Sequence, residues 1–338
     1  MKALKVIGII FSVLLIFMCV INIIPPSIAV HNNPFISPNR VMVAAHRGGA
    51  DNNPENTLKA FKTAVEEYEV DILESDLYLT SDGYLVFNHD SYIDETCNTY
   101  PELTLDEVED LIDQDKSKRH YIQDMTLDEL RQYNFGYYFE DEQGNRPYKD
   151  VTNIKEEGLQ ILEVSEMFNT FYNRHKDLLF IVEIKNEGEL GKKATDTLIN
   201  ILDTKFPVYK NRIVIGTYHD EIEKYLASTY PNMFRGASMG AAAGFIITEM
   251  FKVNLLNNAG FACLQIPMEF ELFEIKDKEF SLNLAKKAYI KKAHKRNIAV
   301  QYWTINDEEE MKLLIELGCD AIMTDNPKLL KQVLENMA

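Results

Sequence analysis

Residues 71–90 read DILESDLYLTSDGYLVFNHD. Apolar, β-branched and aromatic residues flank the dipeptide Asp82-Gly83, which favours a two-residue type I′ turn, so this stretch is predicted to form a β-hairpin. With that dipeptide as the loop, the numbers of opposed residues sum to 165, and His89 is expected directly across from Asp76. Glu74 lies on the same face, because strand side chains repeat every two residues. One face of the hairpin is therefore predicted to carry two carboxylates and an imidazole.

Around this hairpin the sequence predicts strands that alternate with helices. The predicted strands are 41–45, the two arms of the hairpin with its return strand at 84–88, then 178–184, 212–217, 233–238, 261–266, 298–303 and 320–324. The predicted helices run from Asn56 to about Tyr68, then over 162–174, 190–204, 219–230, 241–252, 281–296, 307–317 and 327–336. Near-continuous apolar strands in this alternation are typical of a parallel sheet covered by helices.

The number of strands narrows the α/β class to a barrel. A two-residue turn joins only antiparallel neighbours, so the return strand is set aside and eight parallel strands remain, the number that closes a (β/α)₈ TIM-type barrel. An open, doubly wound sheet is the alternative, but no glycine-rich phosphate-binding fingerprint follows the first strand. In a barrel, the functional residues are expected at the carboxyl ends of the strands.

Three segments lie outside this alternation. Residues 1–24 contain an apolar run preceded by lysines, which predicts an N-terminal transmembrane helix with the remaining domain outside the cytoplasm. A cleaved signal segment, and hence a secreted protein, is the alternative. Residues 25–40, rich in proline, are predicted to be a linker, and residues 41–338 the barrel domain. Within that domain, the acidic region 91–158 is predicted to be a small inserted subdomain after the hairpin, whose two Thr-x-x-Glu sequences each start a helix.

The composition limits the class of ligand. The formal net charge is −18, which argues against a nucleic acid partner, because phosphate backbones are bound by basic surfaces. An enzyme acting on phosphate esters would need local positive charge from a metal ion, arginine or lysine. The four cysteines show no metal-binding spacing and no dense framework, although a single disulfide stays open.

Polar residues gather at the predicted carboxyl ends of the strands. They are His46 and Arg47 after the first strand, Glu74 and Asp76 on the second, His89 on the return strand side, Glu183 and Lys185 at the third, and Trp303 after the seventh. Glu74, Asp76 and Glu183 are hard oxygen ligands on two neighbouring strands, which suits one divalent cation, Ca²⁺ or Mg²⁺.

The remaining residues of this set suit an anionic substrate. His46 and His89 beside a cation can act as acid and base, and Arg47 and Lys185 supply charge for a phosphate. This combination predicts metal-assisted phosphodiester cleavage. Some of these residues also have a structural interpretation. Glu183 and Lys185 could form a buried ion pair, and Trp303 could serve either substrate binding or packing. Residues 55–57 are interpreted as helix capping residues.

Seven motifs in order resemble the signature of the glycerophosphodiester phosphodiesterase family. They are His46-Arg47-Gly48-Gly49, Pro54-Glu55-Asn56-Thr57, Glu74-x-Asp76, Thr80-x-Asp82-Gly83 with His89-Asp90, Glu183-Ile184-Lys185, Trp303-Thr304-Ile305-Asn306 and Thr324-Asp325-Asn326-Pro327. The resemblance implies a TIM-type barrel with an insertion, a histidine acid/base pair, a divalent metal and hydrolysis of small-molecule or lipid-derived glycerophosphodiesters to glycerol 3-phosphate and an alcohol. A related lipid phosphodiesterase of the phospholipase C or sphingomyelinase D kind, and a catalytically silent membrane-tethered binding module, are the alternatives.

Overall fold

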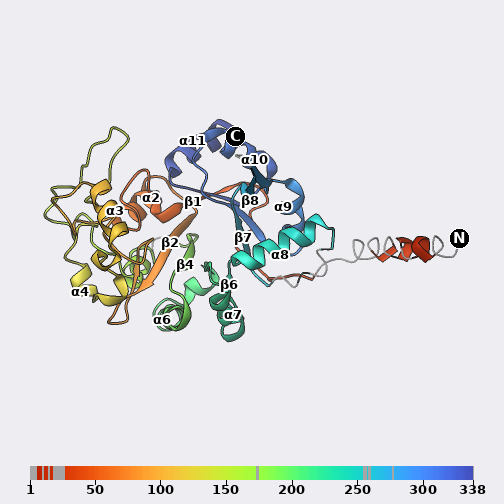
Figure 1. The fold of residues 1–338 in the computed structure, drawn as a ribbon, viewed down its shortest axis with the longest axis horizontal. Helices are drawn as coiled ribbons and strands as arrows, with labels where there is room; N and C mark the ends of the chain where they lie inside the picture. Colours follow the sequence, from red (N-terminus) through yellow and green to blue (C-terminus); the bar gives the residue numbers. More distant parts are fainter. Residues whose placement is uncertain are drawn as a thin grey trace.

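The protein folds around a parallel barrel, as the strand count predicts. The computed structural model describes residues 6–9, 11–13, 16–17, 27–172, 175–253, 257, 260–275 and 278–337. The strands are β1 (Met42–Ala45), β2 (Ile72–Leu79), β4 (Leu179–Ile184), β5 (Ile213–Gly216), β6 (Phe234–Arg235), β7 (Cys263–Ile266), β10 (Ala299–Tyr302) and β11 (Ala321–Thr324). They pair in the order β6-β5-β4-β2-β1-β11-β10-β7 (Figure 1). A parallel bridge between Gly236 and Cys263 joins the two ends of this order, so the ring of strands is nearly closed.

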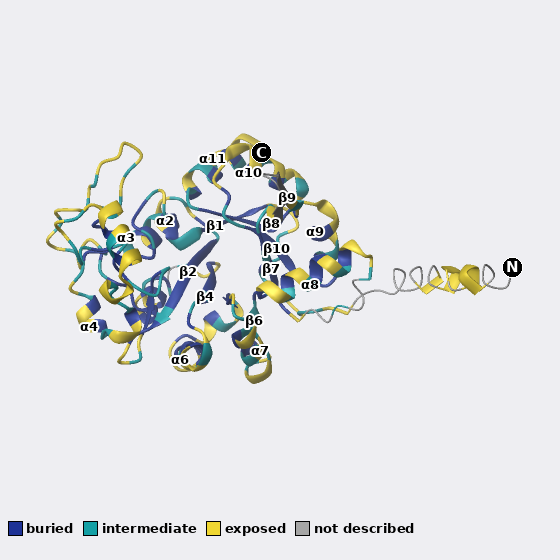
Figure 2. Ribbon diagram, in the orientation of Figure 1, coloured by how far each residue is buried: buried dark blue, intermediate teal, exposed yellow. Residues whose placement is uncertain are grey.

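Helices surround the ring of strands. They are α2 (Leu58–Glu66), α5 (Val164–Phe171), α6 (Gly188–Thr204), α7 (Asp220–Thr229), α8 (Met239–Met250), α9 (Lys287–His294), α10 (Glu308–Leu317) and α11 (Pro327–Met337). A large apolar core lies between the strands and the inner faces of the helices, and a smaller apolar core fills the barrel itself. Figure 2 shows the buried strands at the centre and exposed residues on the outer sides of the helices.

The predicted hairpin over residues 71–90 forms, but with a register that differs from the predicted one. The strand β3 (Leu85–Phe87) pairs antiparallel with β2, and Leu77 faces Phe87, so opposed residue numbers sum to 164. Asn88 therefore lies across the hairpin from Asp76, and its backbone N–H donates to the Asp76 carbonyl over 3.0 Å. The prediction that His89 lies directly opposite Asp76 is wrong by one residue.

The turn explains this shift. The backbone N–H of Thr80 donates to the Tyr84 carbonyl over 2.9 Å, and the N–H of Gly83 donates to the Thr80 carbonyl over 3.1 Å. Gly83 has φ of 89°, the left-handed conformation that glycine adopts without strain. The loop is thus three residues long, a type I turn followed by a left-handed residue, instead of the predicted two-residue loop.

The insertion after the hairpin is built from short helices. They are α3 (Leu105–Gln114) and α4 (Leu127–Leu130), and each begins with a complete capping box, at Thr104 with Glu107 and at Thr126 with Glu129. Both predicted capping boxes are confirmed. One small apolar cluster, around Val108 and Ile112, consists of the insertion's own residues, and a second packs the insertion against Val86 of β3 and Ile161. The boundaries of the subdomain at 91–158 stay a prediction.

One predicted helix is partly wrong. Residues 281–283, expected at the start of a helix over 281–296, belong to a second hairpin of β8 (Glu269–Ile275) and β9 (Lys278–Asn283). The helix α9 starts only at Lys287. The hairpin leaves the barrel after β7 and forms a separate two-stranded sheet.

The predicted linker packs, in part, against the base of the barrel. Phe35 is fully buried in the core inside the barrel, and the side-chain amide of Asn33 donates to the carbonyl of Ala262, directly before β7, over 2.8 Å. The N-terminal segment 1–24 lies largely outside the described residues. Among the residues that are described, no helix is long and apolar enough to span a bilayer.

Candidate active site

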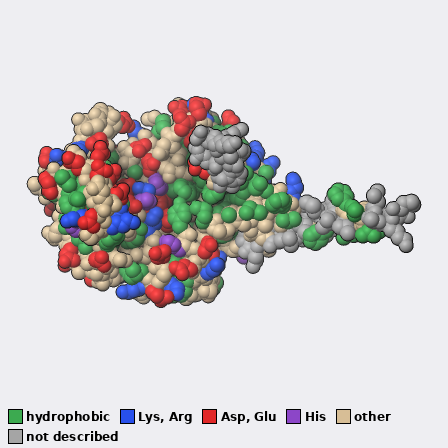
Figure 3. Space-filling model, in the orientation of Figure 1, with side chains coloured by type: hydrophobic (Ala, Val, Ile, Leu, Met, Phe, Trp, Pro, Cys, Tyr) green, Lys and Arg blue, Asp and Glu red, His purple; other side chains and the backbone are tan. Residues whose placement is uncertain are grey.

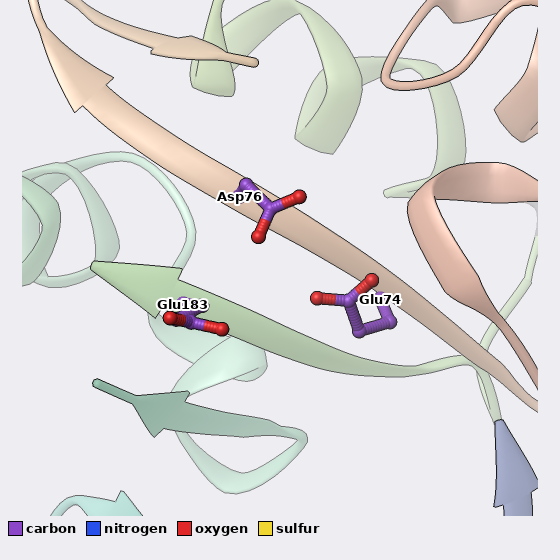
Figure 4. A group of neighbouring side chains, drawn as sticks. All are labelled: Glu74, Asp76 and Glu183. Carbon is purple, nitrogen blue, oxygen red and sulfur yellow. The ribbon is translucent and has the colours of Figure 1, made fainter. Parts of the chain in front are cut away.

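Three carboxylates from two adjacent strands meet inside the barrel. In the parallel pairing of β2 with β4, Asp76 is the partner of Glu183, and Glu74 lies two residues earlier on the same face. One carboxylate oxygen from each residue lies within 4.8 Å of the others. Figure 4 shows the three side chains on the two neighbouring strands. The structure therefore brings together all three residues that the sequence predicts as metal ligands.

The electrostatics of this carboxylate cluster fit a cation. Burial and the neighbouring charge of Asp76 raise the pKa of Glu74 well above its usual range, and burial likewise raises the pKa of Glu183. Among the residues that the structure describes, Glu183 Oε1 is buried without a hydrogen-bond partner, and it lies 3.5 Å from Lys185 Nζ. Crowded, desolvated carboxylates with a free oxygen are the donor set that a hard divalent ion prefers, because the ion's charge offsets their repulsion.

His46 is held by residues that follow β11 and β10, on the side of β1 away from the carboxylates. It follows β1, and its Nδ1 lies 2.6 Å from Asp325 Oδ1, directly after β11. Asn306 donates from its side-chain amide to the second oxygen of Asp325 over 2.7 Å. The Asp325 carboxylate thus accepts the Nδ1 proton, and Nε2, 4.0 Å from Glu74, is left facing the carboxylate cluster as the nitrogen able to exchange a proton.

This arrangement makes a prediction for the metal-free protein. Burial lowers the pKa of His46, but the hydrogen bond to Asp325 and the charges of Glu74 and Asp325 outweigh it, so the pKa is raised above 6.5. Replacing Asp325 with asparagine is expected to lower the pKa of His46, measured by NMR titration of the imidazole. His294, whose pKa is raised by its own hydrogen bond to Asp320, is the internal control and should not move. An unchanged His46 titration would contradict the role of Asp325.

His89 reaches the site from the loop that follows β3. The buried side chain of Asn88 fixes this loop by donating to the carbonyls of Asp90 and Tyr92 over 2.8 and 3.0 Å. His89 Nδ1 lies 3.3 Å from Asp90 Oδ1, and the imidazole is partly exposed. Burial raises the pKa of Asp90, but the hydrogen bond from His89 and the nearby positive charges of His89, Arg47 and Lys185 together outweigh it, so this pKa is lowered. With the observed register, His89 still reaches the site, but from the loop after β3 and not as a residue paired with β2.

Two cations border the carboxylates. Arg47 donates its backbone N–H to Glu74 Oε2 over 2.9 Å and its guanidinium Nη1 to Glu55 Oε2 over 2.8 Å. Lys185 Nζ lies 3.4 Å from Asp76 Oδ1. These acidic partners hold the two cations at the site, where their positive charge offsets part of the negative charge of the three carboxylates.

Some residues of the site were not predicted as such. Asn56 was expected to cap α2, but Thr57 is the cap, and the side chain of Asn56 lies 3.3 Å from Asp76 Oδ2 instead. Glu55, also interpreted as a capping residue, pairs with Arg47. Asp325 belongs to the motif Thr324-Asp325-Asn326-Pro327, for which the sequence predicted no function at the site. Their motif positions were the only signal, because each contacts a partner that is 8, 20 or 279 residues away in the sequence and that only the fold brings near.

The predicted site residues line one cavity of about 410 Å³. Its lining includes all eight predicted site residues, namely His46, Arg47, Glu74, Asp76, His89, Glu183, Lys185 and Trp303. Trp303 is half-buried, and its ring meets that of Tyr218 edge to face at 6.2 Å. It packs against the core inside the barrel and also lines the cavity, so the packing role is observed and substrate binding by Trp303 stays a prediction.

The chain is similar to known proteins over most of its length. A family model described as the glycerophosphoryl diester phosphodiesterase family matches residues 46–239 and 253–329. A glycerophosphodiester phosphodiesterase of Caldanaerobacter subterraneus is 25% identical, over 86% of this chain and 96% of its own.

Solved structures share the fold. The glycerophosphoryl diester phosphodiesterase domain of a Mycobacterium tuberculosis protein superposes with a TM-score of 0.66 at 15% identity, over 87% of this chain and 99% of that one. A phosphodiesterase of Oleispira antarctica in complex with the product sn-glycerol-3-phosphate gives 0.62 at 19% identity, over 88% and 97%.

Proposed function

The chain belongs to the glycerophosphoryl diester phosphodiesterase family, a family of hydrolases, and from this premise we propose that it uses two histidines and one divalent cation to hydrolyse glycerophosphodiesters. The observation that carries the proposal is the cavity in which His46 and His89 stand beside three crowded carboxylates and two cations. The products are glycerol 3-phosphate and the alcohol of the head group.

Glu74, Asp76 and Glu183 would hold the cation, and Ca²⁺ and Mg²⁺ both suit these oxygen ligands. When bound, the cation supplies charge neutralisation and polarisation of the phosphate oxygens. Arg47 and Lys185 add positive charge at the same end of the cavity, and Trp303 forms one of its walls. These residues bind and orient the phosphodiester.

The two histidines move the protons. One takes a proton from the attacking oxygen, which is that of water or of the substrate's own glycerol hydroxyl, as this oxygen bonds to phosphorus. The other gives a proton to the alcohol oxygen as its bond to phosphorus breaks. When the glycerol hydroxyl is the attacking group, this step leaves a cyclic glycerol phosphate, which water then opens to glycerol 3-phosphate in a second step. With Asp325 on its Nδ1, His46 exchanges the proton through Nε2.

Product identification tests this reaction. With glycerophosphocholine and glycerophosphoethanolamine, the purified protein is expected to release glycerol 3-phosphate and the free amino alcohol, measured by mass spectrometry. Release of phosphocholine instead would place the broken bond on the other side of the phosphorus and support the phospholipase C alternative. Absence of any product over a range of substrates would favour a binding module.

We further propose that the enzyme acts outside the cytoplasm, held at the cell membrane by residues 1–24. The support is the apolar run behind two lysines at the N-terminus. Fractionation of cells that make the full chain should place it in the membrane, accessible to protease added outside. Recovery of a shortened chain in the medium would instead favour the cleaved signal segment.

A further inference from the structure

The turn between β5 and α7 lies beside the carboxyl end of β4. In the parallel pairing of these strands, Gly216 is the partner of Glu183, so residues 217–219 emerge next to Lys185. The ring nitrogen Nε2 of His219 lies 3.2 Å from the Lys185 carbonyl oxygen, and the backbone N–H of His219 donates to Thr217 Oγ1 over 3.1 Å. The turn is therefore attached to the backbone of Lys185.

Tyr218, in the same turn, contacts the ammonium of Lys185. Lys185 Nζ lies over the ring of Tyr218, 5.7 Å from its centre. At this distance, a cation is attracted by the negative face of an aromatic ring. The ring meets that of Trp303 edge to face at 6.2 Å, and both aromatic residues line the active-site cavity. Tyr218 is thus supported by Trp303 while its face is turned to Lys185.

The position of Lys185 matters because its ammonium stands on a flexible stem, and it is fixed only where neighbouring groups hold it. In the described lining of the cavity, Arg47 and Lys185 are the arginine and lysine side chains. Figure 3 shows basic and histidine side chains gathered near the middle of one face, with hydrophobic side chains beside them. In a chain of net charge −18, the place of these few positive charges decides where an anionic phosphate binds.

The ammonium of Lys185 has two kinds of partner. Its Nζ lies 3.4 Å from Asp76 Oδ1 and 3.5 Å from Glu183 Oε1, and both of these partners are carboxylates of the cluster. A divalent cation held by the same carboxylates would offset the charge that attracts the ammonium and would repel it. The attraction of the ring does not depend on the carboxylates. The ring is therefore the partner that can hold Lys185 whether or not a cation is bound.

We propose that Tyr218 is a positioning residue, whose ring face holds the ammonium of Lys185 beside the carboxylate cluster, at the place where it meets the substrate phosphate. This inference rests on the proposed function, in which Lys185 binds the phosphate, and adds a residue that acts through Lys185.

Two substitutions separate the ring of Tyr218 from its hydroxyl group. Tyr218→Phe keeps the ring face and is expected to change kcat/KM on glycerophosphocholine by less than about twofold. Tyr218→Leu removes the ring face and is expected to lower kcat/KM by about tenfold, because the ammonium is no longer held in place. An equal loss in both variants would assign the effect to the hydroxyl group and overturn the proposal, as would full activity of Tyr218→Leu.

The matched control is Tyr84→Leu. Tyr84 lies in the turn between β2 and β3 and is 48% exposed, and Tyr218 is 44% exposed. This variant loses a tyrosine of similar exposure away from the cavity and should keep the parent value of kcat/KM. A tenfold loss in Tyr84→Leu as well would show a nonspecific effect and overturn the assignment to Tyr218.

A double-mutant cycle tests whether Tyr218 acts through Lys185. Lys185→Met removes the charge and keeps an unbranched side chain. In that background, Tyr218→Leu is expected to lower kcat/KM by no more than about twofold, because there is no ammonium left to position. The same tenfold loss in both backgrounds would mean that the ring acts on the substrate or on the fold, and would overturn the proposal.

Urea unfolding of the same four proteins measures the contact without any reaction. The double variant is expected to be destabilised less than the product of the two single effects on the unfolding equilibrium constant, by about fivefold. This coupling should appear in EDTA and persist with saturating Ca²⁺ or Mg²⁺. Purely multiplicative effects in EDTA, or a coupling that the ion abolishes, would overturn the proposal.

Failure of the proposed function is recognised separately, because the parent protein would then release no choline from glycerophosphocholine. The unfolding cycle still decides in that case. A fivefold coupling supports Tyr218 as the group that holds Lys185, and its absence overturns that role.

Discussion

Alanine in place of His89 is expected to lower kcat on glycerophosphocholine by roughly 10² to 10⁴-fold, and alanine in place of His46 by a similar factor. Both imidazoles line the cavity beside the carboxylate cluster, where they can reach the attacking and leaving oxygens of a bound phosphodiester. Steady-state choline release by the purified variants is the measurement. Because the two groups act in one reaction, the double variant should lose less than the product of the two single losses.

The control for these variants is His31→Ala, at an exposed position before the barrel. It should keep full activity. Circular dichroism and thermal unfolding must show that each site variant is folded like the parent. A loss below tenfold in a folded His46 or His89 variant would remove that histidine from the proton transfers.

Removal of divalent cations with EDTA is expected to abolish hydrolysis, and added Ca²⁺ or Mg²⁺ to restore it. Three buried or half-buried carboxylates repel one another, so a bound ion is also expected to stabilise the fold. At a concentration 100 times its dissociation constant, the ion should add about 2.7 kcal/mol to the free energy of unfolding, seen as a rise in Tm. The metal that gives the larger effects at equal concentration is the better candidate.

Glu183→Gln separates the metal site from nonspecific effects of the ion. This variant should lose both the restoration of activity and the rise in Tm, because it removes one charged ligand from the cluster. Glu189→Gln, at a highly exposed carboxylate on α6, is the matched control and should behave like the parent. Full activity of the parent in excess EDTA would contradict the metal proposal and favour a metal-free phosphodiesterase.

Local sequence was sufficient to predict much of the fold. The periodicity of apolar residues predicted the strands and helices, and their number and alternation predicted the barrel. This worked because the apolar pattern of each element reflects which of its faces is buried. Charged residues within apolar strands, such as Glu74 and Glu183, indicated the site, because a charge at such a position needs a partner or a task. The capping boxes were predicted for the same reason, since both partners lie three residues apart.

Other features depended on choices that the local sequence leaves open. In the turn Thr80–Tyr84, Gly83 suits the left-handed position of either a two-residue or a three-residue loop. The loop length follows only from the observed pairing of the two strands. The pairing of His46 with Asp325 joins residues 279 positions apart. At the second hairpin, Phe280, Leu282 and Leu284 alternate with polar residues, a two-residue period that the helix prediction overlooked.

The packing of residues 29–37 on the barrel has a consequence for orientation. Asn33 is bound beside the start of β7, and the Ser37 N–H donates to Asp320, which precedes β11, so this segment covers the amino ends of the strands, opposite the catalytic cavity. If residues 6–24 span the bilayer, only 25–28 remain as a free tether, at most about 14 Å when extended. The amino ends of the strands would then face the lipid, and the opening of the cavity would face away from the membrane. Such an enzyme would collect its substrates as single molecules that have already left the bilayer.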